Sequence, residues 1–159
     1  MINVLLAFGA NLGNREETLR SAWKELETLP DTEAFQISTF YETKPVGGPP
    51  EQPDYVNAAG TIRTELPPVE LLKHLQQIEY RFGRVRTERR GARTLDIDIL
   101  LYGSEIINLP ELTVPHSEML HRNFVLRPVQ DVAADWIHPV SGLTLSAHFA
   151  ALFGKSTTS

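Results

Sequence analysis

Apolar positions in the first third of the chain predict a strand, a helix and a second strand. Residues 3–9 are mostly apolar, and residues 9–13 have the glycines and asparagine of a turn. Asn14 can cap a helix whose apolar positions recur at the spacing of one helical face. That face would consist of Leu19, Ala22, Trp23, Leu26 and Leu29. Residues 35–41 then alternate between apolar and polar positions, which predicts a strand.

The middle of the chain predicts another strand and another helix after a loop rich in proline and glycine. Residues 45–53 form that loop, and an extended pattern resumes over residues 55–64. Pro67 and Pro68 open a second helix, because proline is tolerated in the first turn. Gly83 is expected to end it. The buried face of this helix would be lined by Leu71, Leu72, Leu75, Ile78 and Phe82.

The last third begins with a predicted strand at residues 94–102, followed by a tight turn and a short extended stretch at 105–108. A proline-bounded loop at 110–115, a short segment at 124–132 and a helix near 145–152 complete the chain. Strands interleaved with two helices in this order predict an α+β sandwich, with helices packed on a largely antiparallel sheet. We expect one domain over residues 1–159.

Composition narrows the class of protein. The chain has no cysteine, which excludes disulfides, thiolate catalysis and cysteine-based zinc sites. No apolar run approaches the roughly 20 residues of a membrane-spanning helix. The net charge of −5 argues against general nucleic-acid binding. We therefore expect a cytoplasmic protein whose partners are small molecules, with no membrane and no nucleic acid.

Positive charge is concentrated in one segment of this acidic chain. Residues 81–93 hold six arginines and one acidic residue, Glu88, so the segment carries +5. Arginine binds phosphate oxygens in bidentate fashion and keeps its charge. The chain lacks both glycine-rich phosphate-binding motifs, GxxxxGK[ST] and GxGxxG. The segment alone fits a phosphate site, a solubilising loop or an RNA-binding patch equally well.

Two aspartates lie within the predicted strand that follows the arginine-rich segment. Leu95, Ile97 and Ile99 would face the core, and Asp96 and Asp98 would face the opposite side, about 6–7 Å apart at Cα. Mg²⁺ is commonly held by one or two carboxylates plus phosphates, and paired metals lie roughly 3.5–4 Å apart. Two aspartates on a solvated sheet face are the plainer alternative. Aspartate is depleted in strands, however, and the arginines adjoin the pair.

Five ordered motifs resemble one enzyme family, the 6-hydroxymethyl-7,8-dihydropterin pyrophosphokinases. The longest runs from Gly83 to Leu101 and contains Arg-Arg-Gly-Ala-Arg-Thr-Leu-Asp-Ile-Asp. The other four span residues 9–13, 41–59, 112–116 and 122–126. The resemblance implies a ferredoxin-like fold. It also implies transfer of the β,γ-diphosphate of ATP to the hydroxymethyl group of the dihydropterin, with release of AMP, in folate biosynthesis.

The resemblance also implies roles for individual residues. Asp96 and Asp98 would bind two Mg²⁺ ions, and Arg84 and Arg93 would stabilise charge on the transferred group. The nucleotide would contact Gln76, Glu79, Arg84, Arg93, Ile99, Thr113, His116 and Arg122. The pterin would lie between Tyr55 and Phe124, and its polar edge would meet Thr43, Lys44, Val46 and Asn57. The enzyme is expected to be a monomer.

A reaction that must exclude water predicts moving loops. We expect residues 83–93 and 45–53 to close when ATP and pterin are both bound. Two rival functions use some of the same residues. An RNA-binding module would use the arginines but would place Asp96 and Asp98 against phosphates. A Mg²⁺-dependent phosphohydrolase shares the aspartates and would release phosphate from ATP without pterin.

Overall fold

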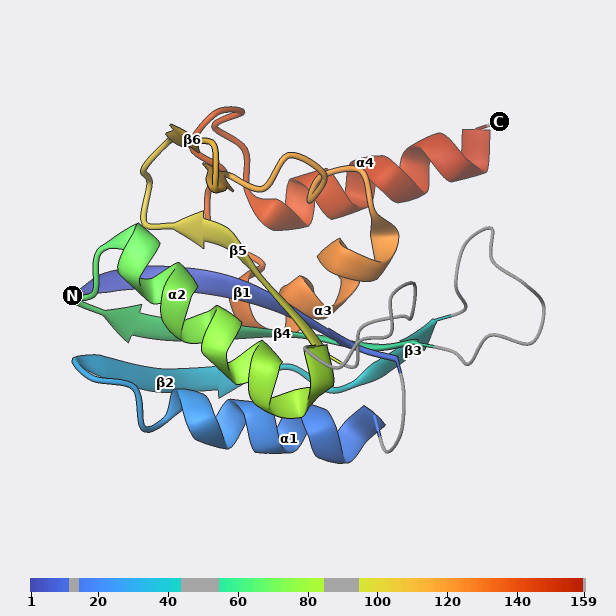
Figure 1. The fold of residues 1–159 in the computed structure, drawn as a ribbon. Coiled ribbons are helices and arrows are strands. Elements are labelled where there is room, and N and C mark those ends of the chain that lie inside the picture. Colours follow the sequence, from blue (N-terminus) through green and yellow to red (C-terminus); the bar gives the residue numbers. More distant parts are fainter. Residues whose placement is uncertain (12–14, 44–54, 85–94, 159) are drawn as a thin grey trace.

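The computed structural model describes residues 1–11, 15–43, 55–84 and 95–158, and its strands form one main sheet (Figure 1). The strands of this sheet are β1 (Ile2–Ala10), β2 (Thr32–Ile37), β3 (Tyr41–Thr43), β4 (Tyr55–Thr64) and β5 (Leu95–Tyr102). Their order is β2-β4-β1-β5, and every pairing is antiparallel. The short strand β3 pairs with the first residues of β4. The prediction of an α+β fold with a largely antiparallel sheet is confirmed.

Helices cover both faces of the sheet. The first face carries α1 (Arg15–Leu26) and α2 (Pro68–Glu79), and α2 continues into a π-helical turn over Tyr80–Arg84. The other face carries α3 (Asn123–Ala133) and α4 (Leu145–Thr158) (Figure 1). A two-stranded ribbon of β6 (Ile107–Leu109) and β7 (Leu112–Val114) contributes apolar residues to the core under α1 and α2. Among the described residues, no helix is long and apolar enough to cross a membrane.

The two faces of β1 explain why its sequence is almost continuously apolar. Val4, Leu6 and Phe8 are buried toward α1 and α2, in a core that contains the apolar residues of both helices. Leu5 is buried on the other face with residues of α3 and α4, and Ala7 packs against them. A central strand that is buried on both sides reads as an apolar run rather than as an alternation.

The strand predicted at residues 35–41 is wrong, because the chain breaks into β2 and β3. The backbone of Ser38 donates to the Ala59 carbonyl at 2.8 Å, and the Ser38 hydroxyl accepts the Ala59 N–H at 2.9 Å. A side chain thus replaces a backbone carbonyl in the ladder at this point. Phe35 is 60 % exposed, beside an irregularity between Ala34 and Gln36 where β2 shifts its register on β4.

Other boundaries differ from the pattern. The first helix ends at Leu26, so Leu29 packs on the core from the following turn. Gly83 does not stop the second helix, whose π-helical turn runs to Arg84. The predicted loop at 110–115 contains β7. The segment at 124–132 is the helix α3.

A buried histidine holds the turn between α3 and α4. The Nδ1 atom of His138 accepts backbone N–H groups from Val140 at 3.2 Å and Ser141 at 3.3 Å. Burial, and then the neighbouring His148, lower the pKa of His138 below its ordinary value of 6.5. The neutral ring can therefore keep Nδ1 as an acceptor. Its two hydrogen bonds fix the turn that follows Trp136.

Gly60 should be required by packing. A Cβ atom on this residue would lie 2.6 Å from Cζ3 of Trp23, whose ring packs edge-on against Phe8. We predict that Gly60→Ala lowers the free energy of unfolding by about 1–3 kcal/mol, as overpacking does. Gly9→Ala is the matched control, because its Cβ would meet only Oδ1 of Asn57, at 3.5 Å. Urea unfolding measures both, and equal stability of the two variants would contradict the packing assignment.

Candidate active site

One row of paired residues crosses the sheet at the end where β1 finishes. Tyr41 on β3 pairs with Asn57 on β4, Asn57 pairs with Gly9 on β1, and Gly9 pairs with Asp96 on β5. Directly paired residues of antiparallel strands share a face, so these four lie on the α3 side of the sheet. Gly9 has no side chain, so β1 places none between Asn57 and Asp96 in this row.

The two aspartates are placed as their alternation predicts. Leu95, Ile97 and Ile99 are buried toward α1 and α2, whereas Asp96 is partly exposed and Asp98 is exposed. Asp98 pairs with Ala7, one step along the same face from the pair of Asp96 with Gly9. Both carboxylates therefore extend from the same side of β5, and small residues on β1 leave room beside them.

A buried carboxylate supports the strand that carries the aspartates. Glu79, at the end of α2, is 4 % exposed, and its Oε2 atom accepts the backbone N–H of Ile97 at 2.7 Å. Ile97 lies between Asp96 and Asp98, and β5 is an edge strand of the described sheet. Glu79 was predicted to place the nucleotide. The structure instead shows it in contact with the backbone of β5, so its direct contact with a ligand stays a prediction.

His116 lies beside the second aspartate. Its backbone N–H donates to the Leu100 carbonyl at 3.0 Å, which fixes the residue against the outer edge of β5. Nδ1 accepts the backbone N–H of Glu118 at 3.1 Å, so a neutral ring carries its proton on Nε2. Nε2 is 4.0 Å from Oδ2 of Asp98. The structure thus brings a predicted nucleotide residue next to a predicted metal ligand.

The predicted pterin residues come from different elements on the same face. Asn57 is 8 % exposed in the crossing row, and Tyr55 lies two residues earlier on β4. Phe124 is in the first turn of α3, with the Arg122 guanidinium 5.7 Å from its ring centroid. Tyr55 and Phe124 are each partly exposed, so each retains surface that a ligand could contact. The sandwich itself stays a prediction.

Several predicted residues are placed with less detail. Gln76 is partly buried on α2, and Thr113 is exposed on β7. The Ile99 side chain is buried in the core, so only its backbone could meet a nucleotide. Some of the predicted contacts lie outside the described residues, namely Lys44, Val46, Arg93 and the side chains of Thr43 and Arg84. Of the two segments expected to close, 45–53 lies wholly outside them, and 83–93 lies outside them from residue 85 onward.

Sequence reasoning missed two residues near the site, Asp131 and the side chain of Asn11. Asp131 on α3 accepts the Tyr41 hydroxyl at 2.8 Å and the Thr39 hydroxyl at 3.0 Å, which ties β3 to α3 beside the crossing row. No local signal could reveal this, because some 90 residues separate the partners. Asn11, in the turn motif after β1, is buried, and its Oδ1 has no hydrogen-bond partner among the described residues. That atom is an available acceptor at the edge of the site.

The donors present suit a hard cation. Within residues 1–11, 15–43, 55–84 and 95–158, no three His, Cys, Asp or Glu side chains are grouped to hold a metal by themselves. Asp96 and Asp98 supply carboxylate oxygens from one face. Mg²⁺ is usually bound by one or two carboxylates, with substrate phosphates and water completing its shell. The pair therefore fits Mg²⁺ held together with a phosphate ligand.

The order and pairing of the elements define the fold class. The elements β1-α1-β2-β4-α2-β5, with strand order β2-β4-β1-β5, form the β-α-β-β-α-β arrangement of ferredoxin-like proteins. The family model described as 7,8-dihydro-6-hydroxymethylpterin-pyrophosphokinase (HPPK) matches residues 5–134. The chain belongs to this pyrophosphokinase family.

Relatives extend the match over most of the chain. A 2-amino-4-hydroxy-6-hydroxymethyldihydropteridine pyrophosphokinase of Haemophilus influenzae is 49 % identical over 141 residues, covering 89 % of this chain and 88 % of that one. A protein of the same name from Pseudomonas aeruginosa is 45 % identical over 132 residues, covering 83 % of this chain and 81 % of its own.

Solved structures share the fold. A Plasmodium falciparum HPPK-DHPS triple mutant with pteroate superposes with a TM-score of 0.75 at 15 % identity, over 97 % of this chain. The wild-type protein with pterin and p-hydroxybenzoate gives 0.75 at 14 % identity, over 99 %. This chain spans 44 % of each of those longer chains.

Removing the Glu79 carboxylate should destabilise the strand that carries the aspartates. We predict that Glu79→Ala lowers the free energy of unfolding by about 1–3 kcal/mol, because it leaves the buried Ile97 N–H without an acceptor. Glu79→Gln should lose less, since the amide oxygen can still accept. Gln77→Ala, an exposed change on the same helix, is the control for urea unfolding. If Glu79→Ala were as stable as Gln77→Ala, the supporting role would be wrong.

Proposed function

We propose that the chain transfers the β,γ-diphosphate of ATP to the hydroxymethyl group of 6-hydroxymethyl-7,8-dihydropterin and releases AMP, a step of folate biosynthesis. Membership of the pyrophosphokinase family supports the reaction. One structural observation supports its location: Asp96 and Asp98 share a face of β5, and Asp96 pairs with Gly9, which in turn pairs with Asn57. Carboxylates for a metal–phosphate group and a polar edge for the pterin are thus neighbours.

Asp96 and Asp98 would hold two Mg²⁺ ions together with the triphosphate. Bound there, the ions supply neutralisation of phosphate charge and acidification of the pterin hydroxyl. His116, with its Nε2 near Asp98, would orient that carboxylate or donate to a phosphate oxygen. Arg84 and Arg93 would contribute positive charge toward the transferred group. These roles are proposals that the placement of Asp96, Asp98 and His116 supports.

The pterin would lie over the row that crosses the sheet. Asn57 offers a donor and an acceptor, which match the aminopyrimidinone edge of a pterin. Gly9 lets a flat ring approach the sheet beside Asn57, and Tyr55 and Phe124 would contact the two faces of the ring. The Asp131 bonds that hold β3 against α3 would keep Phe124's helix in place next to Asn57. The substrate hydroxyl would then point toward Asp96.

A monomer is proposed as the working state. A cytoplasmic location is proposed with it, since the cysteine-free composition suits a reducing compartment.

The carboxylates should be essential for AMP formation. We predict that Asp96→Asn and Asp98→Asn each lower kcat about 100- to 1,000-fold with the fold intact, because metal-held charge is lost from the transition state. AMP is measured with protein, Mg²⁺ and ATP, with and without the hydroxymethyl dihydropterin. Glu105→Gln, an exposed acid just beyond the same strand, is the control and should retain activity.

The same assay separates the pyrophosphokinase from the rival phosphohydrolase. AMP should form only when the pterin is present. Inorganic phosphate released from ATP without pterin would instead favour a phosphohydrolase. Wild-type turnover in either aspartate variant would remove the proposed metal site even if the reaction itself were observed.

Phe124 should matter for the pterin rather than for ATP. We predict that Phe124→Ala weakens pterin binding on the order of tenfold, because an aromatic contact worth about 1 kcal/mol and its buried area are lost. Isothermal titration compares pterin and ATP analogues on the same variant. Phe35→Ala is the control, since Phe35 also lies under an arginine, Arg63, but far along the sheet. A larger loss for ATP than for pterin would be inconsistent with the sandwich.

A further inference from the structure

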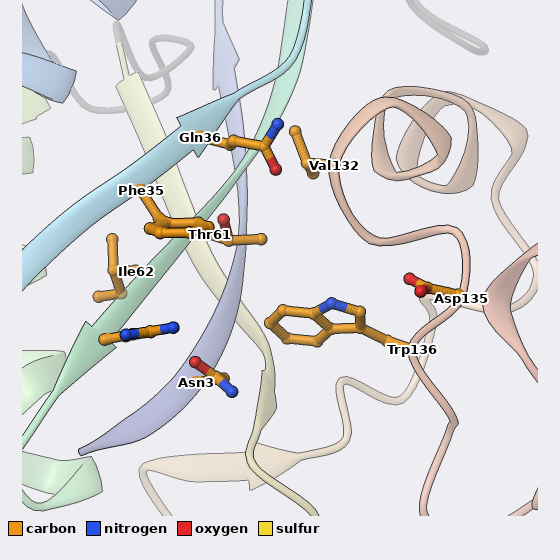
Figure 2. A pocket seen from close by; sticks show the side chains of 9 residues that line it. Asn3, Phe35, Gln36, Thr61, Ile62, Val132, Asp135 and Trp136 are labelled. Carbon is orange, nitrogen blue, oxygen red and sulfur yellow. The ribbon is translucent and has the colours of Figure 1, made fainter.

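A cavity lies on the α3 side of the sheet, between the strands and the segment in which α3 ends (Figure 2). Its volume is about 290 Å³. The sheet residues Asn3, Phe35 and Thr61 lie on one side, and Val132, Asp135 and Trp136, from α3 and the segment after it, lie on the other. Gln36, Ile62 and Arg63 complete the lining.

The floor of the cavity contains a polar atom without a partner. Thr61 is 3 % exposed, and its Oγ1 has no hydrogen-bond partner within the described part of the chain. Thr61 pairs with Leu5 on β1 and Gln36 on β2, so its side chain is on the face that α3 covers. A buried hydroxyl with no partner is unfavourable, because it has lost its hydrogen bond to water. Valine would fill the same space without this cost, so a ligand that bonds the hydroxyl would explain it.

The other cavity on the described surface differs in this respect. It is larger, about 540 Å³, and lies between α1 and the segment joining β2 to β3. None of its lining residues has a buried polar atom that lacks a partner. Of these two cavities, the argument for a ligand applies to the one around Thr61.

The lining indicates the chemistry of the ligand. Arg63, on the sheet side, provides a fixed positive charge, and its guanidinium lies 5.1 Å from the Phe35 ring centroid. Asp135, on the opposite side, provides a negative charge next to the indole of Trp136. An aromatic wall between opposite charges suits a flat ring with an anionic group at one end and a hydrogen-bond donor at the other.

The size restricts the ligand to a single ring. Sites for drug-sized molecules occupy about 300–1,000 Å³, so this cavity lies at the lower limit. We propose that it binds a small aromatic carboxylate that carries an amino or similar donor group. The carboxylate pairs with Arg63 and accepts a hydrogen bond from the Thr61 hydroxyl, since these residues lie two positions apart on the same face of β4. The donor group faces Asp135, and the ring packs on Trp136.

This site is separate from the proposed active site. Thr61 is four residues along β4 from Asn57, a separation of about 13 Å. Phe124 is at the start of α3, whereas Asp135 and Trp136 follow its end. Binding in the cavity does not require the pyrophosphokinase activity, so the proposal stands or falls separately from that function.

The test uses 4-aminobenzoate as the probe and the two tryptophans as reporters. Protein labelled with ¹⁵N-tryptophan gives two indole signals, one from Trp136 in the cavity and one from Trp23 on α1. Addition of 4-aminobenzoate should shift the Trp136 signal in a saturable way and leave the Trp23 signal in place. Benzoate and aniline, which each lack one polar group, should bind at least fivefold more weakly.

Variants assign the contacts. Arg63→Gln should weaken 4-aminobenzoate about tenfold, and Thr61→Val at least threefold while the protein remains as stable as the parent or becomes more stable. Arg20→Gln is the matched control, because Arg20 lies over Phe40 at 5.2 Å on the other face of the sheet and should leave binding unchanged. An unmoved Trp136 signal at millimolar probe, or equal binding by the parent and Arg63→Gln, would overturn the proposal.

Discussion

A buried hydrogen bond from the Ile97 amide to the Glu79 carboxylate fixes the strand on which the proposed chemistry depends. Edge strands present unpaired backbone groups, and here two of them are satisfied from outside the sheet. Glu79 accepts the Ile97 amide, and the His116 backbone donates to the Leu100 carbonyl. With β1 bonded along its inner side, β5 is held from both directions. The strand that carries Asp96 and Asp98 therefore has little freedom to rotate.

The sheet assigns different tasks to its two faces. One face is closed by α1 and α2 over a continuous apolar core. The other is covered by α3 and α4 around Leu5, Ala59 and Leu101. At one end of that face lie Gly9, Asn57 and the aspartates, and at the other lies the cavity around Thr61. The helix α3 spans the interval between them, so its packing on β4 sets the boundary of both sites.

Short-range patterns in the sequence were sufficient for much of this fold. The alternation in residues 95–99 correctly predicted which side chains of β5 would be buried, and the extended stretch at 55–64 coincides with β4. The family resemblance assigned Asp96 and Asp98 to metal and Asn57 to the pterin, and the register of the strands puts all three on one face of the sheet. These features depend on spacing along the chain, which the sequence displays directly.

The remaining features depend on contacts between distant segments. Residues 35–41 look like one strand, but the Ser38 hydroxyl takes a place in the ladder opposite Ala59 and divides it. The bond from Glu79 to Ile97, and those from Tyr41 and Thr39 to Asp131, join elements that no local pattern relates. The partnerless hydroxyl of Thr61 is visible only once α3 is placed over β4.

The central claim is that Asp96 and Asp98 act together on metal-bound phosphates. A crystal structure with Mg²⁺, a non-hydrolysable ATP analogue and the hydroxymethyl dihydropterin tests it most directly. The account predicts that oxygens of both carboxylates coordinate Mg²⁺ ions that also contact the triphosphate, with the pterin over Gly9. Density for the nucleotide elsewhere, with both carboxylates remote from metal and phosphate, would contradict it.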